Sequence, residues 1–321
     1  KARKHTALLE RVQAAAKPGL VYVATRKHAE ELAALLSEGG LRAAHYHAGL
    51  ASSARKETEA AFMADAYDVL VATTAFGMGI DKPNVRFVYH ADISESLDAY
   101  YQEIGRAGRD GEPAEAVLFY SHNDLHLRRF LASNGKVEAA DVQQVIAALQ
   151  EQDEPLTADD LLEQVDLSKS KIKTVLAHLS DLGAVDTLAT GEVIPADALD
   201  AEHAQAAAEL QEQRQGAKRS RIEMMRSYAE ATTCRRACLL GYFGEEYEPP
   251  CDACDNCRAG AQTPLAADTP FPVSSQVQHA AWGPGTVLRY EGDTMTVLFD
   301  SAGYKTLDTQ VVVEQQLLTP G

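Results

Sequence analysis

The sequence predicts an α/β protein in which a lobe built on a parallel β-sheet precedes three smaller modules. Short apolar runs alternate with amphipathic segments from residue 5 to residue 120, a pattern typical of a parallel sheet covered by helices on both faces. Helical periodicity then dominates from about residue 139 to residue 240, and β-patterned runs return after residue 274. These observations indicate four modules in the order α/β, helical, helical and all-β.

The composition is that of a globular protein. A chain of 321 residues with 45% hydrophobic content can form several packed cores. Its longest apolar runs, such as Val69–Ala72, are far shorter than the ~20 residues of a membrane span, and no signal peptide opens the chain. We therefore expect a cytoplasmic protein.

The formal net charge of -17 is distributed unevenly. Nine acidic residues and no Lys or Arg lie between Glu138 and Asp166, whereas Arg214 to Arg236 holds seven basic residues. Since nucleic-acid binding depends on local patches rather than on total charge, an acidic protein can still present one basic surface.

The first lobe, residues 1–135, is expected to alternate helices and strands. Ligands of such a sheet bind at the carboxyl ends of its strands. Helices are predicted at His5–Ala16, His28–Glu38, Ser53–Ala64 and Ser96–Ile104, and strands at Gly19–Ala24, Arg42–Tyr46, Asp68–Ala72, Val85–His90 and Glu115–Tyr120.

Residues 136–200 predict a winged-helix-like domain. The second and third of its helices, Ala139–Glu151, Ala158–Val165 and Lys169–Leu182, are joined by a short turn, which is a helix-turn-helix spacing. A short wing is expected at Ala184–Ile194. The third helix has one apolar face, formed by Ile172, Val175, Leu176, Leu179 and Leu182, and begins with Lys169, Lys171 and Lys173. These lysines suit DNA contact, although the acidic first two helices make packing or protein binding an alternative.

The five cysteines are crowded into Cys234–Cys257. We assign residues 201–260 to a helical zinc-binding domain whose long helix, Ala201 to about Leu240, has a possible interruption at Gly216. Four thiols can enclose a tetrahedral zinc ion that supports folding, and an odd count argues against a disulfide framework. The expected ligands are Cys234, Cys251, Cys254 and Cys257. Cys238 is expected to be a small buried hydrophobe, with ligand exchange as the alternative.

The end of the chain predicts a linker at residues 261–273 and a small β-barrel at residues 274–321. Its expected strands include Gly285–Tyr290, Met295–Phe299 and Gln310–Val313. Trp282 is expected to lie in the barrel core rather than to contact a partner.

Two arginines, Arg106 and Arg109, lie in a turn with Gly105 and Gly108. A guanidinium group suits phosphate because it is always charged and binds with two parallel hydrogen bonds. The alternative is that they are solvated or paired with carboxylates such as Asp110 or Glu112.

No phosphate loop of the form GxxxxGK[ST] occurs anywhere in the sequence. If the arginines serve a nucleotide, the rest of that site must lie outside these residues. The first residue is Lys1 rather than Met, which is consistent with an N-terminal truncation.

The segments Val71–His90 and Gln102–Asp110 resemble motifs V and VI of the superfamily 2 helicases, in a form closest to the RecQ family. Val21–Lys27 resembles motif IV, and Ala43–Leu50 with Ser53–Phe62 resembles the segment that follows it. Gln102 stands where DEAD-box RNA helicases have histidine, which favours the DNA-directed RecQ branch. Asp81 stands where many RecQ sequences have asparagine.

This resemblance implies that residues 1–135 form the second of two RecA-like lobes, between which ATP and Mg²⁺ bind. It implies that Arg109 contacts the γ-phosphate beside Arg106, and that Gln102 couples the site to lobe closure. Nucleotide contacts are implied for Gly77, Gly79 and Asp81. Contacts to the DNA backbone are expected for Thr25, Arg26 and Thr73, with ordinary strand-end roles as the alternative.

The zinc segment "PCDACDNC" also resembles the RecQ zinc-binding domain, which implies that Arg235 and Arg236 lie near DNA. Two features depart from the RecQ plan. The winged helix precedes the zinc domain instead of following it, and no HRDC-type helical domain follows. The last module instead resembles SH3- or Tudor-like barrels of other bacterial helicases.

The resemblance as a whole implies an ATP-dependent 3′–5′ DNA helicase of repair and recombination that acts on single-stranded DNA and duplex junctions. A protein partner for the barrel is possible. This chain, which lacks the Walker lysine and the DExH box, is expected to be inactive alone. The alternative is a non-enzymatic DNA-binding or repair-scaffold protein that retains a degenerate helicase lobe.

Overall fold

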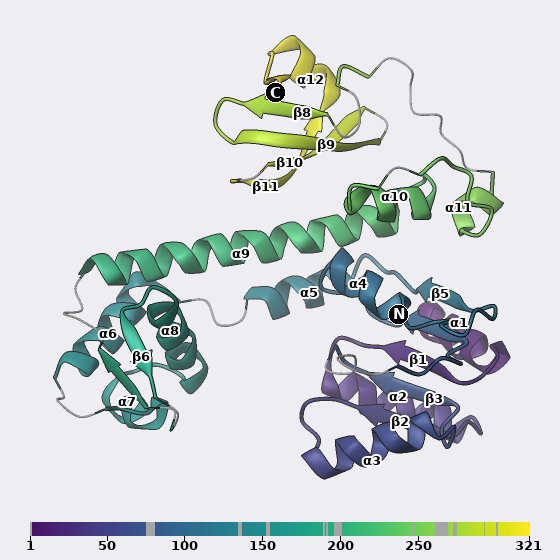
Figure 1. Ribbon diagram of the computed structural model, residues 1–321, viewed down its shortest axis with the longest axis horizontal. Helices are drawn as coiled ribbons and strands as arrows, with labels where there is room; N and C mark the ends of the chain where they lie inside the picture. The colour runs from purple at the N-terminus through teal and green to yellow at the C-terminus, as the bar shows by residue number, and fades with distance from the viewer. Residues whose placement is uncertain are drawn as a thin grey trace. The chain divides into compact units, whose positions relative to one another are not determined.

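The computed structural model describes most of the chain and divides it into two compact units (Figure 1). Unit 1 comprises residues 1–129 and 220–321, and unit 2 comprises residues 130–219. The described residues are 2–74, 81–133, 137–151, 155–188, 190, 192–195, 201–245, 247–260, 269–271, 275–291, 293–299 and 301–321.

Unit 1 contains the predicted parallel sheet. Its order is β2-β3-β1-β4-β5, and every neighbouring pair is parallel. The strands are β1 (Gly19–Tyr22), β2 (Ala43–Tyr46), β3 (Val69–Ala72), β4 (Phe87–His90) and β5 (Glu115–Leu118). Strand β1 is central and pairs in parallel with β3 and β4. The loops that follow these three strands therefore begin at the same carboxyl edge of the sheet.

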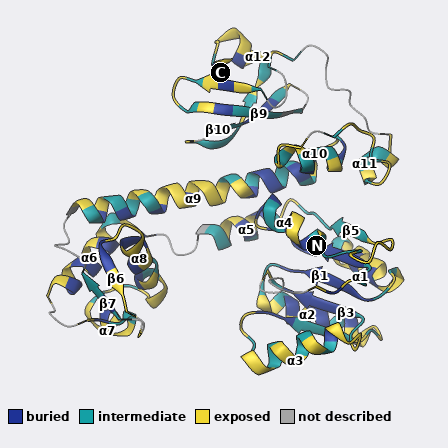
Figure 2. Ribbon diagram, viewed as in Figure 1, coloured by how far each residue is buried: buried dark blue, intermediate teal, exposed yellow. Residues whose placement is uncertain are grey.

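Helices cover both faces of this sheet, as Figure 2 shows by its buried strands. On one face Val21 and Val71 pack with Leu8 of α1 (Ala2–Ala14) and with α2 (Arg26–Glu38). On the other face Leu20 packs in a core that includes residues of α3 (Ser52–Met63) and α4 (Leu97–Ile104). Consecutive strand residues thus serve opposite cores. A further helix that was not predicted, α5 (Asp124–Ser133), follows the last strand.

Among its described residues, unit 2 contains three complete helices and a two-stranded hairpin, the arrangement expected of a winged helix, together with the first part of the long helix that follows. The elements are α6 (Ala139–Gln150), α7 (Ala158–Gln164), α8 (Lys169–Asp181), β6 (Val185–Thr187) and β7 (Val193–Pro195). Four members of the predicted apolar face of α8 are buried in one core with Ala204 and Ala207, whereas Leu182 is 39% exposed.

The predicted long helix is two helices. Helix α9 (Ala201–Glu230) continues through Gly216, and α10 (Arg235–Tyr242) is separate. A single glycine costs a helix only ~1 kcal/mol, whereas the carbonyls of Ala231 and Thr233 accept hydrogen bonds of 2.7 Å from the Asn256 side chain instead of continuing the helix. Among the described residues no helix is long and apolar enough to cross a membrane.

The chain leaves and re-enters unit 1 at two neighbouring points. Arg129, the last residue before unit 2, lies 2.5 Å from Glu223, a few residues after unit 2 ends (Nη2 to Oε1). This ion pair therefore joins the two connections between the units.

The C-terminal part of unit 1 is an antiparallel five-stranded sheet of order β11-β10-β9-β8-β12. The prediction of a strand at Gln310–Val313 is wrong, because these residues belong to α12. Asp308 caps this helix by accepting a hydrogen bond of 3.1 Å from the Val311 N–H. The elements are β8 (Gln276–His279), β9 (Gly283–Glu291), β10 (Thr294–Phe299), β11 (Gly303–Asp308), α12 (Thr309–Glu314) and β12 (Leu318–Pro320).

Trp282 packs against the core of this sheet and is partly buried. Its ring stacks on His279 at 4.0 Å between centroids, which agrees with the expected core position. Most of the predicted linker lies outside the described residues.

Candidate functional site

The arginine turn, residues 105–112, is held against the segment that precedes β4. Helix α4 begins after Ser96, near the carboxyl end of β4, and runs back along the sheet. The Gly108 N–H donates to the Val85 carbonyl at 2.9 Å, and the Asp110 N–H donates to the Pro83 carbonyl at 3.2 Å. Gly108 has φ +66, and a Cβ there would lie 2.9 Å from the Glu112 carbonyl oxygen. The turn therefore requires glycine at this position.

Arg109 contacts Asp81, so two residues expected at the nucleotide lie together. Their Nη1 and Oδ1 atoms are 2.7 Å apart, and both side chains are exposed, by 37% and 81%. Asp110, which the sequence analysis considered as an alternative partner, instead forms an ion pair with Arg86 (Oδ1 to Nη2, 2.5 Å). The other two residues expected there, Gly77 and Gly79, lie outside the described residues.

Arg106 faces the sheet, whereas Gln102 faces solvent. Arg106 is half-buried and forms a hydrogen bond with Tyr22 at the end of β1. Burial and the Glu103 charge raise the pKa of Tyr22, and Arg106 opposes that rise. Gln102 is exposed on α4, one helical turn before Arg106. Its proposed coupling role stays a prediction.

A buried polar cluster fixes α4 beneath the arginine turn. Glu103 is 7% exposed, and its Oε2 lies 2.7 Å from Nε2 of the fully buried His90. The Ser94 hydroxyl donates to the same oxygen at 2.9 Å. The sequence analysis did not single out Glu103, because a glutamate on a helix is ordinarily exposed.

We predict that Glu103→Ala lowers the free energy of unfolding by about 3 kcal/mol, because it leaves the buried His90 and Ser94 groups without their acceptor. Urea denaturation followed by circular dichroism measures this. Glu112→Ala, at an exposed position in the same turn, is the control and should change stability by less than about 0.5 kcal/mol. Equal effects of the two substitutions would contradict a supporting role for the cluster.

The expected DNA contacts Thr25 and Thr73 follow two neighbouring strands at the carboxyl edge of the sheet. The Val23 N–H donates to the Ala72 carbonyl at 2.9 Å, which extends the pairing of β1 with β3. The Thr25 hydroxyl caps α2 by accepting from the His28 N–H at 3.2 Å. Arg26 is exposed at the start of α2. The three residues thus share one edge, and their contact with DNA stays a prediction.

A histidine–carboxylate pair that the sequence analysis missed lies near this edge. The buried His47 places Nε2 3.0 Å from Glu30 Oε1, and the His45 ring stacks on His47. The alternating histidines at positions 45 and 47 were the available signal. The Glu30–His47 contact fastens α2 to the segment after β2.

The four predicted zinc ligands form one cluster in unit 1. The sulfur atoms of Cys234, Cys251, Cys254 and Cys257 all lie within 4.8 Å of one another. Sγ of Cys251 and Sγ of Cys257 are 3.9 Å apart, and Zn–S bonds of ~2.3 Å in a tetrahedron place sulfurs about 3.8 Å apart. The donor set and its spacing therefore fit zinc.

The electrostatics of the cluster also suit a cation. Burial opposes ionisation of Cys251, but hydrogen bonds, chiefly from the backbone N–H groups of Ala253 and Cys254, lower the pKa of this thiol to about 6. A backbone hydrogen bond within the cluster favours ionisation of Cys257, but burial and the hydrogen bonds with the neighbouring thiols outweigh it and raise the pKa of this thiol to about 12. Thiolates this close repel one another unless a metal ion balances their charge.

Cys238 is not a member of the cluster. It is half-buried, and its sulfur lies 3.0 Å from the Thr233 hydroxyl. Its position one helical turn after Cys234 therefore does not bring its sulfur among the four ligands.

Of the two arginines beside the cysteines, Arg235 has a structural role. It binds both carboxylate oxygens of Asp255, at 2.6 and 2.9 Å, and donates to the Tyr228 carbonyl at 2.8 Å. Arg236 is exposed, with its guanidinium 5.7 Å from the centre of the Tyr247 ring. Arg236 is therefore the more available for DNA, and both DNA roles stay predictions.

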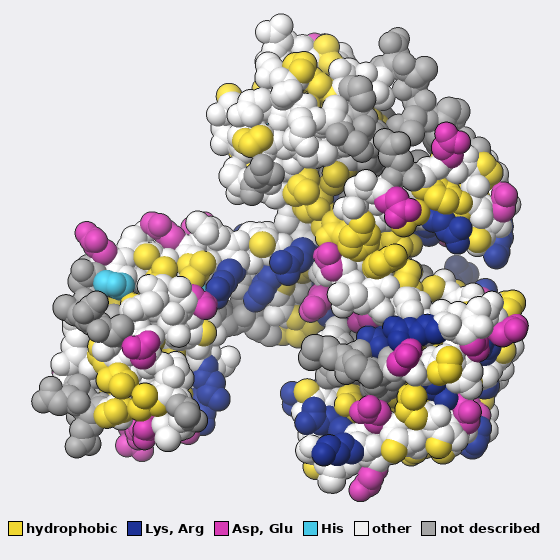
Figure 3. All heavy atoms as spheres, viewed as in Figure 1, with side chains coloured by type: hydrophobic (Ala, Val, Ile, Leu, Met, Phe, Trp, Pro, Cys, Tyr) yellow, Lys and Arg dark blue, Asp and Glu magenta, His cyan; other side chains and the backbone are white. Residues whose placement is uncertain are grey.

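The three lysines of unit 2 have different surroundings. Lys169 pairs with Asp159 at 2.5 Å, and Lys171 pairs with Asp141 at 2.7 Å. Lys173 instead borders a cavity between α8 and α9. Figure 3 shows acidic and basic side chains intermixed on the visible surface of this unit. Two of the three lysines are thus already neutralised by carboxylates of α6 and α7.

Two family models match this chain. The helicase conserved C-terminal domain matches residues 3–111, which include the arginine turn, and the RecQ zinc-binding domain matches residues 195–258, which include the four cysteines.

Named relatives are RecQ helicases. The ATP-dependent DNA helicase RecQ of Bacillus subtilis is 50% identical over 37% of this chain and 20% of its own length. RecQ of Pasteurella multocida is 35% identical over 75% of this chain and 26% of its own length. The probable helicase RecS of Bacillus subtilis is 32% identical over 80% of this chain and 49% of its own length. The chain thus spans a fifth to a half of these relatives.

Among solved structures, the Escherichia coli DEAD-box protein SrmB is 31% identical over 36% of this chain and 68% of that chain, with a TM-score of 0.34. The two family models fall on the parts that carry the arginine turn and the cysteine cluster, and the matches to RecQ of Pasteurella multocida and to RecS cover three quarters or more of the chain. The chain belongs to the RecQ-like family of superfamily 2 DNA helicases.

Proposed function

We propose that this chain supplies the second RecA-like lobe and the zinc-binding region of an ATP-dependent 3′–5′ DNA helicase that acts in DNA repair and recombination. The observation that carries this proposal is the contact between Arg109 and Asp81, in a turn that also holds Arg106 and follows Gln102. ATP and Mg²⁺ would bind where this surface meets a first lobe.

In this proposal Arg109 exchanges Asp81 for the γ-phosphate of ATP. An exposed ion pair contributes only ~0–1 kcal/mol, so the exchange costs little. A guanidinium group delivered to a transferring phosphoryl group stabilises the charge of the transition state. Asp81, once released, would lie at the edge of the nucleotide site with Gly77 and Gly79.

The DNA backbone would lie along the carboxyl edge that Thr25, Arg26 and Thr73 share. The arginine turn does not lie on this edge, because its backbone forms hydrogen bonds with Pro83 and Val85, which precede β4. Helix α4 connects the two regions, so nucleotide-driven lobe closure could move the DNA-binding edge. Single-stranded DNA and duplex junctions are the proposed partners, in the cytoplasm, and the C-terminal sheet is the proposed site for a protein partner.

We predict that residues 1–321 alone hydrolyse ATP no faster than the buffer background, because the sequence contains no phosphate loop. Joined to a RecQ-type first lobe, the same residues should support DNA-stimulated phosphate release and should unwind duplexes that carry a 3′ single-stranded tail. ATP hydrolysis is measured as phosphate release with and without DNA. The polarity of unwinding is measured by comparing duplexes with a 3′ tail and duplexes with a 5′ tail. Robust turnover by residues 1–321 alone would overturn the proposal.

A further inference from the structure

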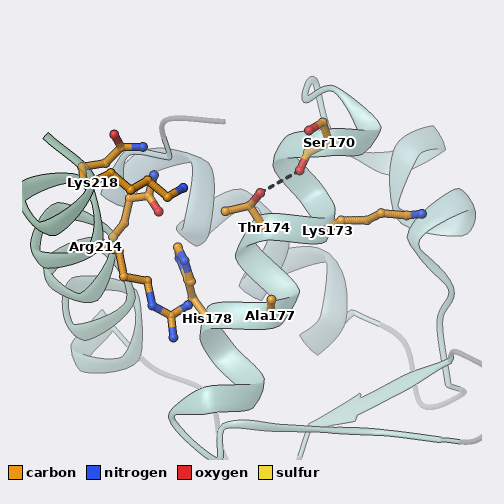
Figure 4. Close-up of a pocket in the computed structure, with 9 residues that line it drawn as sticks. Ser170, Lys173, Thr174, Ala177, His178, Arg214 and Lys218 are labelled. Carbon is orange, nitrogen blue, oxygen red and sulfur yellow. Dashed lines mark hydrogen bonds between the residues drawn. The ribbon is translucent and has the colours of Figure 1, made fainter. Parts of the chain in front are cut away.

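A cavity of about 370 Å³ lies within unit 2, between α8 and the part of α9 that belongs to this unit (Figure 4). Its walls include Ser170, Thr174 and His178 of α8, and Arg214 and Lys218 of α9. The volume is within the range of pockets that bind small ligands or groups. The helicase lobe and the cysteine cluster contribute nothing to it.

The α9 wall is basic. Arg214 and Lys218 are four residues apart, so they lie on the same side of the helix. Asp181 neutralises part of this charge by pairing with Arg214 at 2.7 Å. In the described part of the chain, no carboxylate lies within ion-pair distance of Lys218. In Figure 4 the Lys173 side chain extends away from Arg214 and His178, so α9 supplies the charge that faces the cavity.

His178 faces this charge from α8. It is 3% exposed, and its Nδ1 atom is buried without a hydrogen-bond partner among the described residues. Figure 4 shows its ring beside the Arg214 guanidinium. Burial and the charges of Arg214 and Lys218 lower the pKa of His178, so the ring is neutral at pH 7 and carries one N–H donor. When Nδ1 carries the proton, an oxygen acceptor bound in the cavity would supply the hydrogen-bond partner that this buried atom lacks.

No Asp or Glu is among the described residues that line the cavity. The Thr174 hydroxyl donates to the Ser170 carbonyl at 2.9 Å, so this carbonyl already has a donor. Ala177, which also lines the cavity, is exposed and carries only a methyl group.

We propose that this cavity is a phosphate-binding site in which Lys218 and Arg214 balance the charge and His178 lies against the bound group. The phosphate that we assign to it belongs to the backbone of DNA, because Lys and Arg contacts to backbone phosphates position a protein on nucleic acid. The assignment rests on the proposed function and deepens it. DNA would contact the seam between α8 and α9, whereas Lys169 and Lys171 at the start of α8 are held by carboxylates.

The test measures the affinity of the whole chain for a duplex with a single-stranded tail, by fluorescence anisotropy over a series of salt concentrations. Lys218→Ala should weaken binding about tenfold at low salt, the loss of one charge-assisted hydrogen bond, and should reduce the slope of log K against log salt by about 0.9. Ala177→Glu, which adds a carboxylate at the rim without burying it, should weaken binding at least as much.

The matched control is Arg219→Ala. Arg219 is exposed on the same helix, adjacent to Lys218, but does not line the cavity. The Arg219→Ala substitution should change the affinity for the tailed duplex by less than about twofold, since the charge of Arg219 is screened by solvent and salt. If Lys218→Ala and Ala177→Glu behave as Arg219→Ala does, DNA does not use the cavity.

A second measurement separates DNA from a free phosphate. Inorganic phosphate is titrated into the chain while the imidazole signals of His178 are followed by NMR. A shift that Lys218→Ala abolishes, with DNA affinity unchanged in that variant, assigns the cavity to a free phosphate-bearing molecule. No shift, together with unchanged DNA affinity, overturns the site. Neither measurement involves ATP, so failure of the site and failure of the helicase proposal are distinguishable.

Discussion

Replacing Arg109 by alanine, in a protein that joins this chain to a first RecA-like lobe, is expected to lower kcat for DNA-stimulated ATP hydrolysis by about 10³-fold or more. The loss arises because an arginine aimed at the γ-phosphate stabilises charge that develops only in the transition state. The KM for ATP should change far less. Phosphate release at saturating DNA, as a function of ATP concentration, gives both constants.

Two further variants test whether the arginine acts on the nucleotide or on the fold. Asp81→Ala removes the carboxylate that pairs with Arg109 in this structure and should leave most of kcat, because the guanidinium remains. Arg109→Lys keeps a positive charge but loses the planar fork, so it should stay well below the wild-type rate.

Stability provides the control for both variants. Each should lower the free energy of unfolding by less than about 1 kcal/mol, since the Arg109–Asp81 ion pair is exposed. A wild-type kcat in Arg109→Ala, or equal losses in Arg109→Ala and Asp81→Ala, would show that the turn is structural.

The arginine site was only partly predictable from the sequence. Glycines at positions 105 and 108 and the arginine spacing predicted a turn, and the structure has one. The partner of Arg109 could not be inferred from local sequence, because Asp81 is 28 residues away and meets it only through the fold. Tyr22, which contacts Arg106, is separated from it by most of the lobe. Tertiary contacts of this kind leave no periodic signal.

Removal of zinc is the second change with a large expected effect. Cys254→Ser should reduce the bound zinc from about one ion per chain to nearly none, because three thiolates and a hydroxyl bind zinc poorly. Structural zinc sites contribute ~10–16 kcal/mol of apparent binding free energy, so the segment around α10 and α11 (Asp255–Arg258) should lose its fold. Mass spectrometry measures the metal content, and limited trypsin digestion measures the accessibility of Arg235.

Cys238→Ser is the matched control, since this cysteine lies in the same segment outside the four-sulfur cluster. It should retain zinc and resist trypsin as the wild type does. Loss of zinc from Cys238→Ser, or retention of a full ion by Cys254→Ser, would contradict the assigned ligand set. The circular dichroism signal of the parallel-sheet lobe should persist in both variants.

The helical and sheet order of the first lobe followed from its pattern because apolar periodicity alone determines which face is buried. Other features depended on the tertiary structure. The valines at positions 311 to 313 favour a strand by composition, but the Asp308 cap begins a helix there. The three lysines at the start of α8 were predicted together as DNA contacts, yet carboxylates of α6 and α7 neutralise two of them. Neither outcome could be read from neighbouring residues.

The contact between Arg129 and Glu223 has a consequence for engineering this protein. Because the two connections to unit 2 meet at one ion pair, we expect the remaining parts to fold when residues 130–219 are excised and the ends are rejoined by a short glycine–serine bridge. The entropy of closing so small a gap is low, and domains whose ends lie close together tolerate transplantation. The same junction offers a place to graft another domain onto the parallel-sheet lobe.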